Sequence, residues 1–177
     1  MFTKDEIRIA NATSRTNGAS AKNKDGSVRA VVPRYVAQYI NKEESLLDFG
    51  AGRDAVHTQW LRELGFNATA YDFGENCIEG LHDKDALNKQ YKVIMASNVL
   101  NVQSSIQMMF TTLRQIRDSL EYGGKFVCNY PSSPRKMDLL TAGDVACMLR
   151  QTFGGSVERV GGTSSAPLWV VRKEYLN

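Results

Sequence analysis

The sequence predicts an α/β fold: a single doubly wound, mostly parallel sheet of seven strands with an antiparallel hairpin at its C-terminal end. Two observations lead to this fold class. Short apolar runs alternate with segments of helical spacing, and the last two apolar runs are joined by a turn rich in glycine and serine. The 177 residues suit one domain with a sizeable core, and we expect residues 1–177 to form a single domain.

The first elements surround a glycine turn. Residues 11–30 are poor in apolar groups and predict a loop, and residues 1–32 are expected to form a polar N-terminal segment or lid. Pro33 opens a short helix that ends near Asn41. The next segments are predicted to be a strand, a helix, a strand and a short helix, near Leu46–Phe49, Ala55–Leu64, Ala68–Tyr71 and Asn76–Gly80.

The later segments continue the alternation. Residues 81–87 have the weakest pattern and supply a third strand only marginally. Apolar runs predict the fourth strand, the fifth strand and the two hairpin strands near Tyr91–Ser97, Lys125–Asn129, Val157–Val160 and Leu168–Val171. Helical spacing predicts two long helices over Ser104–Leu120 and Thr141–Phe153, and Gly154 and Gly155 end the second.

Composition narrows the class of protein. The net charge of +3 permits nucleic-acid binding without demanding it. Three cysteines form no pairwise metal spacing, which favours reduced thiols and a cytoplasmic protein, and two histidines are too few for a histidine-based metal site. No apolar stretch is long enough to span a membrane, and the N-terminus lacks the apolar region of a signal peptide.

The segment Ser45–Asp54 carries the strongest functional signal. An apolar run ends in Asp48, and a glycine turn and a helical pattern follow. Glycine lets the backbone approach a ligand closely. The second predicted strand ends in Asp72, and an acid at that place can accept hydrogen bonds from both ribose hydroxyls of a nucleoside. Together these features predict a nucleoside-cofactor site.

The residues also indicate which cofactor binds. The tract from Gly50 to Ala55 fits the relaxed dinucleotide pattern G-x-G-x-x-A, which alone is a weak signal. Asp48 argues against a dinucleotide, because its carboxylate would repel a pyrophosphate. The same carboxylate suits a cofactor that carries a cationic ammonium and a sulfonium.

On these residues the chain resembles the class I S-adenosylmethionine-dependent methyltransferases, whose first motif is acid-x-Gly-x-Gly. The tract Asp48-Phe49-Gly50-Ala51-Gly52 matches that motif, and Asp72 matches the second-strand acid. The resemblance covers roughly Ser45 to Arg172, and the family also ends its sheet in a hairpin. It implies a Rossmann-like fold, with S-adenosylmethionine as the cofactor.

The resemblance also implies roles for individual residues. Asp48 and the turn that follows it (Phe49, Gly50, Ala51 and Gly52) would hold the methionine end, and Asp72 the ribose. Asp85 and Ala86 resemble the acidic and apolar tract that contacts adenine, although Asp85 also fits an ordinary surface acid. Phe73 packs either on the adenine or in the core.

The candidate catalytic residues are Ser97 and Asn98, directly after the fourth predicted strand, and Ser97 is also expected to contact the cofactor. DNA amino-methyltransferases carry Asp, Asn or Ser here, followed by Pro-Pro-aromatic. This chain departs from that pattern, because Val99, Leu100 and Asn101 replace the prolines and the aromatic residue. Asn98 either orients an acceptor amine or simply ends the strand.

Two further features of the sequence bear on the type of acceptor. The tract that begins at Asn129 is similar to an amine-methylation motif but follows the wrong strand, so we interpret it as coincidence. No cysteine lies where carbon-5 methylation of cytosine would need a thiolate, and Cys128 is expected in the core. No residue stands out as a general base, which favours a nitrogen acceptor.

Basic residues suggest what holds the acceptor. Tyr130, Arg135 and Lys136 follow the fifth predicted strand, and the two cations either bind an acceptor phosphate or carboxylate or form a solvated turn. A second basic group contacts a nucleic-acid backbone or forms a solvated tail, and it comprises Arg15, Lys22, Lys24, Arg29 and Arg34.

The sequence therefore predicts an S-adenosylmethionine-dependent methyltransferase that modifies a nitrogen, more readily on DNA or RNA than on a small molecule. A target base must be flipped out or already single-stranded. The chain has little room for a target-recognition domain, so a homodimer, a partner subunit or a loose sequence preference is expected if DNA is the target. The alternatives are a small-molecule methyltransferase with residues 11–30 as a lid, and a non-catalytic cofactor-binding subunit.

Overall fold

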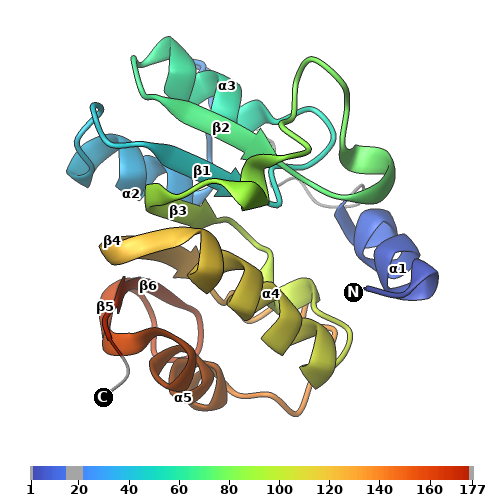
Figure 1. Ribbon diagram of the computed structural model, residues 1–177. Coiled ribbons are helices and arrows are strands. Elements are labelled where there is room, and N and C mark those ends of the chain that lie inside the picture. Colours follow the sequence, from blue (N-terminus) through green and yellow to red (C-terminus); the bar gives the residue numbers. More distant parts are fainter. Residues whose placement is uncertain (1, 15–21, 176–177) are drawn as a thin grey trace.

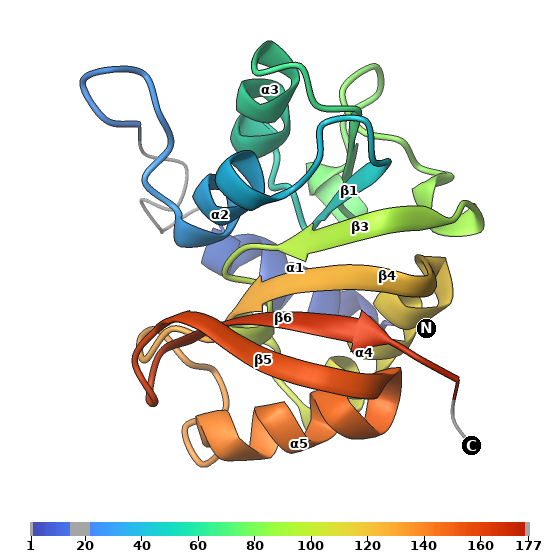
Figure 2. The same ribbon diagram turned by 90° about the vertical axis from the view of Figure 1, so that its left-hand side faces the viewer.

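The computed structural model describes residues 2–14 and 22–175 and contains one mixed sheet of six strands. The strand order across the sheet is β2-β1-β3-β4-β6-β5 (Figures 1 and 2). Strands β1 to β4 run parallel, β6 is antiparallel to β4, and β5 is antiparallel to β6. The strands are Leu46–Phe49 (β1), Ala68–Tyr71 (β2), Tyr91–Ala96 (β3), Leu120–Asn129 (β4), Gly154–Gly162 (β5) and Pro167–Lys173 (β6).

The prediction of seven strands is wrong by one. Residues 81–87, predicted as the marginal third strand, form turns that lead into the short 3-10 helix η3 (Ala86–Asn88). The segment touches the sheet where Asp83 donates its N–H to the Ala70 carbonyl at 2.9 Å. The Asp83 carboxylate then accepts the Asp85 N–H at 2.9 Å, which turns the chain away from β2. Strand β2 therefore stands at the edge of the sheet.

Helices cover both faces of the sheet (Figure 1). Helices α2 (Val31–Tyr39) and α3 (Val56–Glu63) pack on one face, and α4 (Ile106–Ser119) and α5 (Ala142–Phe153) pack on the other. The fully buried strand β1 serves both sides, because Leu46 belongs to the core cluster under α2 and α3, and Leu47 and Phe49 belong to the cluster under α4 and α5.

The N-terminal region differs most from its prediction. The expected loop over residues 11–30 is wrong at its start, because helix α1 (Lys4–Ser14) includes residues 11–14. A reciprocal pair of hydrogen bonds between Thr3 and Glu6 caps this helix. Residues 22–30 form a turn closed by a bridge between Lys22 and Val28. The expected short helix near residues 76–80 is instead the 3-10 helix η2 (Gly74–Asn76).

Helix α1 lies beyond the carboxyl ends of β1 and β2, at the edge of the sheet to which the parallel strands point (Figure 1). The Phe2 ring lies 5.3 Å from the Phe73 ring, which follows β2. The Ser105 hydroxyl donates to Glu6 at 3.2 Å and fixes the helix to the N-terminus of α4. Among residues 2–14 and 22–175, no helix has the length and apolarity needed to cross a membrane.

Candidate functional site

The glycine turn after β1 is fixed against the end of β2. Gly50 and Ala51 both donate their N–H groups to the Tyr71 carbonyl, at 2.9 and 3.0 Å. Gly50 and Gly52 have φ angles of +76° and +74°, which only glycine adopts without strain. A Cβ atom on Gly50 would lie 2.7 Å from a methyl group of Val99, whereas no described atom lies within 4 Å of one on Gly52. The turn is thus tightly packed on one side and open on the other.

Asp72 helps to build this turn. Its carboxylate accepts the Gly52 N–H at 2.7 Å and the Phe73 N–H at 2.8 Å. The side chain is nearly buried, and burial raises the pKa of the carboxyl group, while the two backbone hydrogen bonds oppose the shift. The Asn76 side chain also donates to this carboxylate. A carboxylate has about four lone-pair sites, so acceptor capacity remains for the ribose.

Asp48 lies underneath the turn. It is 1% exposed and accepts the Thr58 hydroxyl at 2.7 Å, which ties β1 to α3. Burial raises the pKa of its carboxyl group, and the nearby imidazole of His57 works in the opposite direction. Asp48 therefore joins β1 to α3, and its contact with the cationic end of a cofactor stays a prediction.

His82 is a site residue that the sequence did not reveal. Its Nδ1 accepts the Ile78 N–H at 3.1 Å, so Nε2 carries the proton and donates to the Gly52 carbonyl at 2.8 Å. The imidazole thus joins the loop after β2 to the glycine turn. A lone histidine in a polar loop, 30 residues from the turn that it contacts, has no sequence motif that could have identified it.

The two residues predicted at the adenine occupy different environments. Asp85 is exposed, whereas Ala86 is fully buried in the core beneath it. Asp85 lines a cavity of about 420 Å³ whose other lining residues are Cys77, Glu79, Gly80, His82, Asp83 and Lys84. Phe73 is half-buried, with one neighbour in the Phe2 ring of the N-terminal segment. The cavity shares His82 with the glycine turn, so both features belong to one site.

Two asparagines join the ends of β3 and β4. The Asn98 N–H donates to the Asn129 side-chain oxygen at 2.8 Å, and the Asn129 amide donates to the Asn98 side-chain oxygen at 2.8 Å. Asn98 has a φ of +58°, a left-handed conformation that asparagine tolerates better than most residues. Asn129 thus belongs to the site although its motif was interpreted as coincidence, because the sheet brings the ends of consecutive strands together.

Ser97 adds a polar group at the same edge. Its hydroxyl oxygen is buried and has no hydrogen-bond partner among the described residues. Such a group costs free energy unless a ligand or water satisfies it. The open face of Gly52, the spare acceptor sites of Asp72 and the Ser97 hydroxyl are the features that a nucleoside cofactor at this edge would use.

Two of the predicted acceptor-binding residues, Tyr130 and Arg135, make hydrogen bonds within the protein. Tyr130 is 1% exposed, and its hydroxyl donates to the Leu140 carbonyl at 2.9 Å. The Arg135 guanidinium lies 4.0 Å from the Tyr130 ring centre and donates to the carbonyls of Pro131, Tyr130 and Ser165. Both side chains thus brace the loop after β4, and the Ser165 carbonyl also ties Arg135 to the turn between β5 and β6. Their contact with an acceptor stays a prediction.

Among the other predicted basic residues, Lys136, Lys22, Lys24, Arg29 and Arg34 are exposed, and Arg15 lies outside the described residues. Lys136 is tied to the site through its backbone, because its N–H donates to the Asn101 carbonyl at 3.0 Å. The Asn101 side chain in turn donates to the Pro134 carbonyl at 2.8 Å. These bonds hold the loop after β4 beside the segment that follows Asn98.

An apolar cavity of about 470 Å³ opens next to this loop. Its lining residues are Ile106, Met137, Asp138, Leu139 and Leu140. Leu139 is 96% exposed and Ile106 is 56% exposed, although both are apolar. Nothing in the sequence pattern distinguished this cavity, because it combines the start of α4 with a loop about 30 residues away in the chain.

A family model described as a methyltransferase domain matches residues 21–155, well over half of the chain. The chain belongs to this family. The match includes the glycine turn, Asp72, His82 and both site asparagines. It confirms the predicted S-adenosylmethionine-dependent methyltransferase and its cofactor, whereas the roles of single residues stay predictions.

Solved structures of methyltransferases share the fold of this methyltransferase. A TehB-like enzyme from Corynebacterium glutamicum superposes with a TM-score of 0.66 at 14% identity, over 94% of this chain and 98% of that one. A Bacteroides fragilis enzyme in complex with S-adenosylhomocysteine gives a TM-score of 0.62 at 14% identity, over 82% and 78%.

A third structure, the magnesium protoporphyrin IX methyltransferase of Synechocystis PCC 6803 with bound S-adenosylmethionine, gives a TM-score of 0.55 at 12% identity. That superposition covers 96% of this chain and 83% of the other. No curated protein sequence matches the chain significantly. At these identities the structures establish the fold and leave the acceptor open.

Proposed function

We propose that this methyltransferase transfers the methyl group of S-adenosylmethionine to a nitrogen atom of a nucleic acid. The observation that carries the proposal is the reciprocal pair of Asn98 and Asn129 at the adjoining ends of β3 and β4. Together with Ser97 it forms a polar group next to the glycine turn. A nitrogen acceptor suits these three side chains, because they provide two amides and a hydroxyl but no strong base.

The cofactor supplies a methyl group on a sulfonium, which makes transfer an in-line displacement. Asp72 would accept hydrogen bonds from the ribose, the turn Gly50–Gly52 would cradle the methionine end, and the cavity shared by His82 and Asp85 would take the adenine edge. The fit rests on the open side of Gly52 and on the Ser97 hydroxyl, which has no hydrogen-bond partner in the described part of the chain.

Asn98 would orient the acceptor. Its side-chain oxygen accepts one hydrogen bond from Asn129 and has a second lone pair for an N–H of the acceptor. Holding the amine in line with the methyl group lowers the barrier by proximity and orientation. An amine loses its extra proton to water after transfer, so the step requires no general base.

The nucleic-acid part of the proposal is supported by exposed cations. Lys22, Lys24, Arg29 and Arg34 lie in or next to the turn that precedes α2, and Lys136 lies in the loop after β4. A base would enter the site flipped out or from a single strand.

We also propose that recognition involves a second copy or a partner subunit. We further propose that the protein acts in the cytoplasm, where Cys77, Cys128 and Cys147 would stay reduced as they are here.

The test is transfer of a labelled methyl group. The purified protein is incubated with S-adenosylmethionine labelled in the methyl group and with single-stranded and duplex DNA and RNA, and the nucleosides are then analysed by mass spectrometry. We expect the label in an N-methylated nucleoside. Label in none of these polymers, with label in small molecules of a cell extract, would contradict the proposal.

A small-molecule acceptor is the second candidate, and a specific observation favours it. The apolar cavity of about 470 Å³ beside the loop after β4 could enclose the body of an apolar compound. One fold neighbour is named for such an acceptor, magnesium protoporphyrin IX. The same labelling experiment separates the candidates, because the extract contains both kinds of acceptor.

A further inference from the structure

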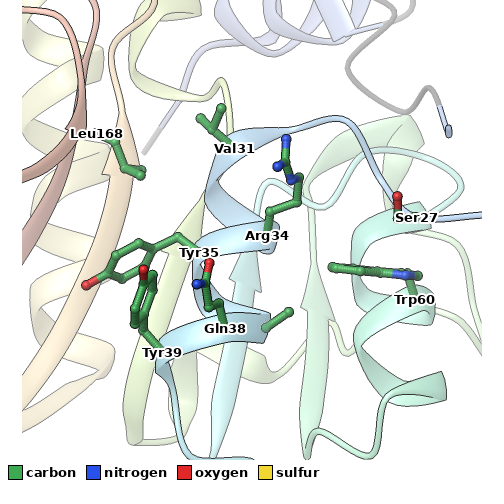
Figure 3. Close-up of a pocket in the computed structure, with 9 residues that line it drawn as sticks. Ser27, Val31, Arg34, Tyr35, Gln38, Tyr39, Trp60 and Leu168 are labelled. Atoms are coloured by element: carbon green, nitrogen blue, oxygen red, sulfur yellow. The ribbon is translucent and has the colours of Figure 1, made fainter.

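A groove along the outer face of α2 lies outside the cofactor site. It has a volume of about 440 Å³ and continues onto α3 and β6 (Figure 3). Its lining residues are Ser27, Val31, Arg34, Tyr35, Ala37, Gln38, Tyr39, Trp60 and Leu168. We propose that this groove binds single-stranded nucleic acid and guides it to the methyl-transfer site. The choice of polymer rests on the proposed function.

The outer face of α2 is unusual for a solvent-facing helix surface. Val32, Val36 and Ile40 point into the core, which leaves the opposite face to the solvent. That face would ordinarily be polar, yet it carries Val31 at 47% exposure and Tyr39 at 61%. Neither side chain is needed for the core at this exposure, so a binding role explains them better than packing does.

Three aromatic rings line the groove and could stack with bases, those of Tyr35, Tyr39 and Trp60. The rings of Tyr35 and Tyr39 lie 4.7 Å apart and tilted by 39°. Figure 3 shows these two rings on one side of α2 and the Trp60 ring on the other, with the Arg34 side chain between them. Proteins that bind single strands combine accessible aromatic rings for the bases with cations for the backbone. A duplex offers no free base faces to such rings.

The charge of the surrounding chain favours a polyanion. Lys22, Lys24, Arg29 and Arg34 are exposed, and Asp25 is the one acid among residues 22–34. The whole chain has a net charge of +3, so this short segment alone accounts for its positive excess. An acid does lie near the far side of the groove, since the Glu158 charge raises the pKa of Tyr35 after the larger effect of burial. We therefore expect the phosphates on the Arg34 side.

The groove also reaches the level of the methyl-transfer site. Leu168 lines the groove and is the register partner of Asn129 in the ladder between β4 and β6. Asn129 is in turn hydrogen-bonded to Asn98. A strand lying on α2 would thus pass its next nucleotide over the edge of the sheet towards the two asparagines.

The test measures binding of fluorescently labelled oligothymidylate and oligouridylate by anisotropy. Tyr39→Ala should weaken binding roughly 5- to 150-fold, the usual effect of removing one stacking platform. Arg34→Gln should flatten the log–log salt dependence by about 0.7 for each phosphate that the arginine neutralises. The matched controls, Tyr122→Ala and Arg150→Gln, replace an exposed tyrosine and an exposed arginine outside the groove and should bind as the wild type does.

Separate outcomes address the groove and the proposed function. Methylation of nucleic acid by the wild type, with equal binding by all of these variants, would overturn the groove and leave the function intact. If binding is weakened in Tyr39→Ala and Arg34→Gln but not in the two control variants, the result supports the groove. It does so even if labelling finds no methylated polymer and the proposed function fails. A change of oligomeric state in Tyr39→Ala by light scattering, without a change in binding, would assign the face to a second copy and overturn the proposal.

Discussion

Asp72 serves two purposes with one carboxylate. It holds the N–H groups of Gly52 and Phe73, and in the proposed function it also accepts the ribose hydroxyls. The sequence predicted the second role from the place of an acid at the end of a strand. It could not predict the first, because the turn and the end of β2 meet only in the folded sheet.

The first prediction concerns the pH dependence at Asp72. Burial raises the pKa of its carboxyl group, and only the carboxylate can accept both ribose hydroxyls. Affinity for S-adenosylhomocysteine should therefore fall as the pH drops through this raised pKa, at a higher pH than for an ordinary aspartate. The same raised pKa changes the stability of the fold in the opposite direction. A carboxyl group whose pKa is higher in the folded than in the unfolded state stabilises the fold at low pH. This stabilisation is lost as the pH rises through the folded-state pKa.

Calorimetry in neutral to acidic buffers measures this dependence. Asp72→Asn serves as the comparison, because it removes the titrating group and should flatten the curve. Its affinity at neutral pH should be lower by about 1.5–3 kcal/mol for each charged hydrogen bond that is removed. Identical pH curves for the two proteins would rule out Asp72 as the group responsible, and would leave the nearby buried carboxyl group of Asp48, whose pKa burial also raises.

The second prediction concerns His82. Replacing it with alanine removes the donor to the Gly52 carbonyl and the acceptor of the Ile78 N–H. The glycine turn should loosen, and affinity for S-adenosylhomocysteine should fall by about 0.5–1.5 kcal/mol for each hydrogen bond. Lys92→Ala is the control, because Lys92 is exposed on β3 and does not line the cavity. Equal affinities of the two variants would show that the imidazole does not position the turn.

The third prediction separates the side chain of Asn98 from its backbone. Asn98→Gly keeps the left-handed conformation at φ +58° but removes the amide that faces Asn129. We expect methyl transfer to fall by about 100-fold through poorer orientation of the acceptor, with cofactor affinity unchanged. The rate is measured with saturating cofactor, and a rate equal to that of the wild type would exclude an orienting role for the side chain.

At the scale of elements, the local signals worked where they were strong. Strands β1 and β2 begin and end at the predicted residues. Each is formed by a short apolar run with an acid near its end, Asp48 within β1 and Asp72 directly after β2. The predicted helix from Thr141 is confirmed, since Thr141 and Asp144 cap it reciprocally. The same pattern, Thr3-x-x-Glu6, precedes α1 and could have revealed that helix, but the polar composition of residues 11–30 outweighed it.

The fourth prediction concerns α1 as a cover of the site. The helix is held at the carboxyl edge by Phe2 against Phe73 and by Glu6 with Ser105. If it closes over the cofactor, S-adenosylhomocysteine should slow tryptic cleavage after the exposed Arg8, in proportion to the fraction of protein bound. Cleavage after Arg150 on α5 is the internal control. Equal slowing at both sites would indicate general stabilisation and no closure of α1.

At the scale of the whole molecule, the order of elements determines where chemistry can occur. Four parallel strands bring Asp48, Asp72, Asn98 and Asn129 to one edge, and this much was predictable from the alternation of strands and helices. Which loop side chains remain free at that edge was not predictable. Arg135 resembled a phosphate ligand in the sequence, yet carbonyl groups from two loops engage it.

The fifth prediction concerns the overall charge distribution. If a nucleic acid is the acceptor, exposed cations neutralise phosphates, and binding should fall with salt at a log–log slope of about −0.9 per neutralised phosphate for a duplex or about −0.7 for a single strand. Replacing Lys22, Lys24 and Lys136 with glutamine should flatten this slope and leave affinity for S-adenosylhomocysteine unchanged. Absence of any binding to DNA or RNA at low salt would favour the small-molecule acceptor.

The unpaired side of β2 has a consequence for how the protein behaves in a crowded solution. An edge strand with free carbonyl groups is a template onto which another chain can add and begin aggregation. Here Arg62 donates its Nε–H to the Ala68 carbonyl at 2.8 Å, and Asp83 donates its N–H to the Ala70 carbonyl. One side chain and one loop thus occupy two of the carbonyl groups on which a strand of another molecule would pair.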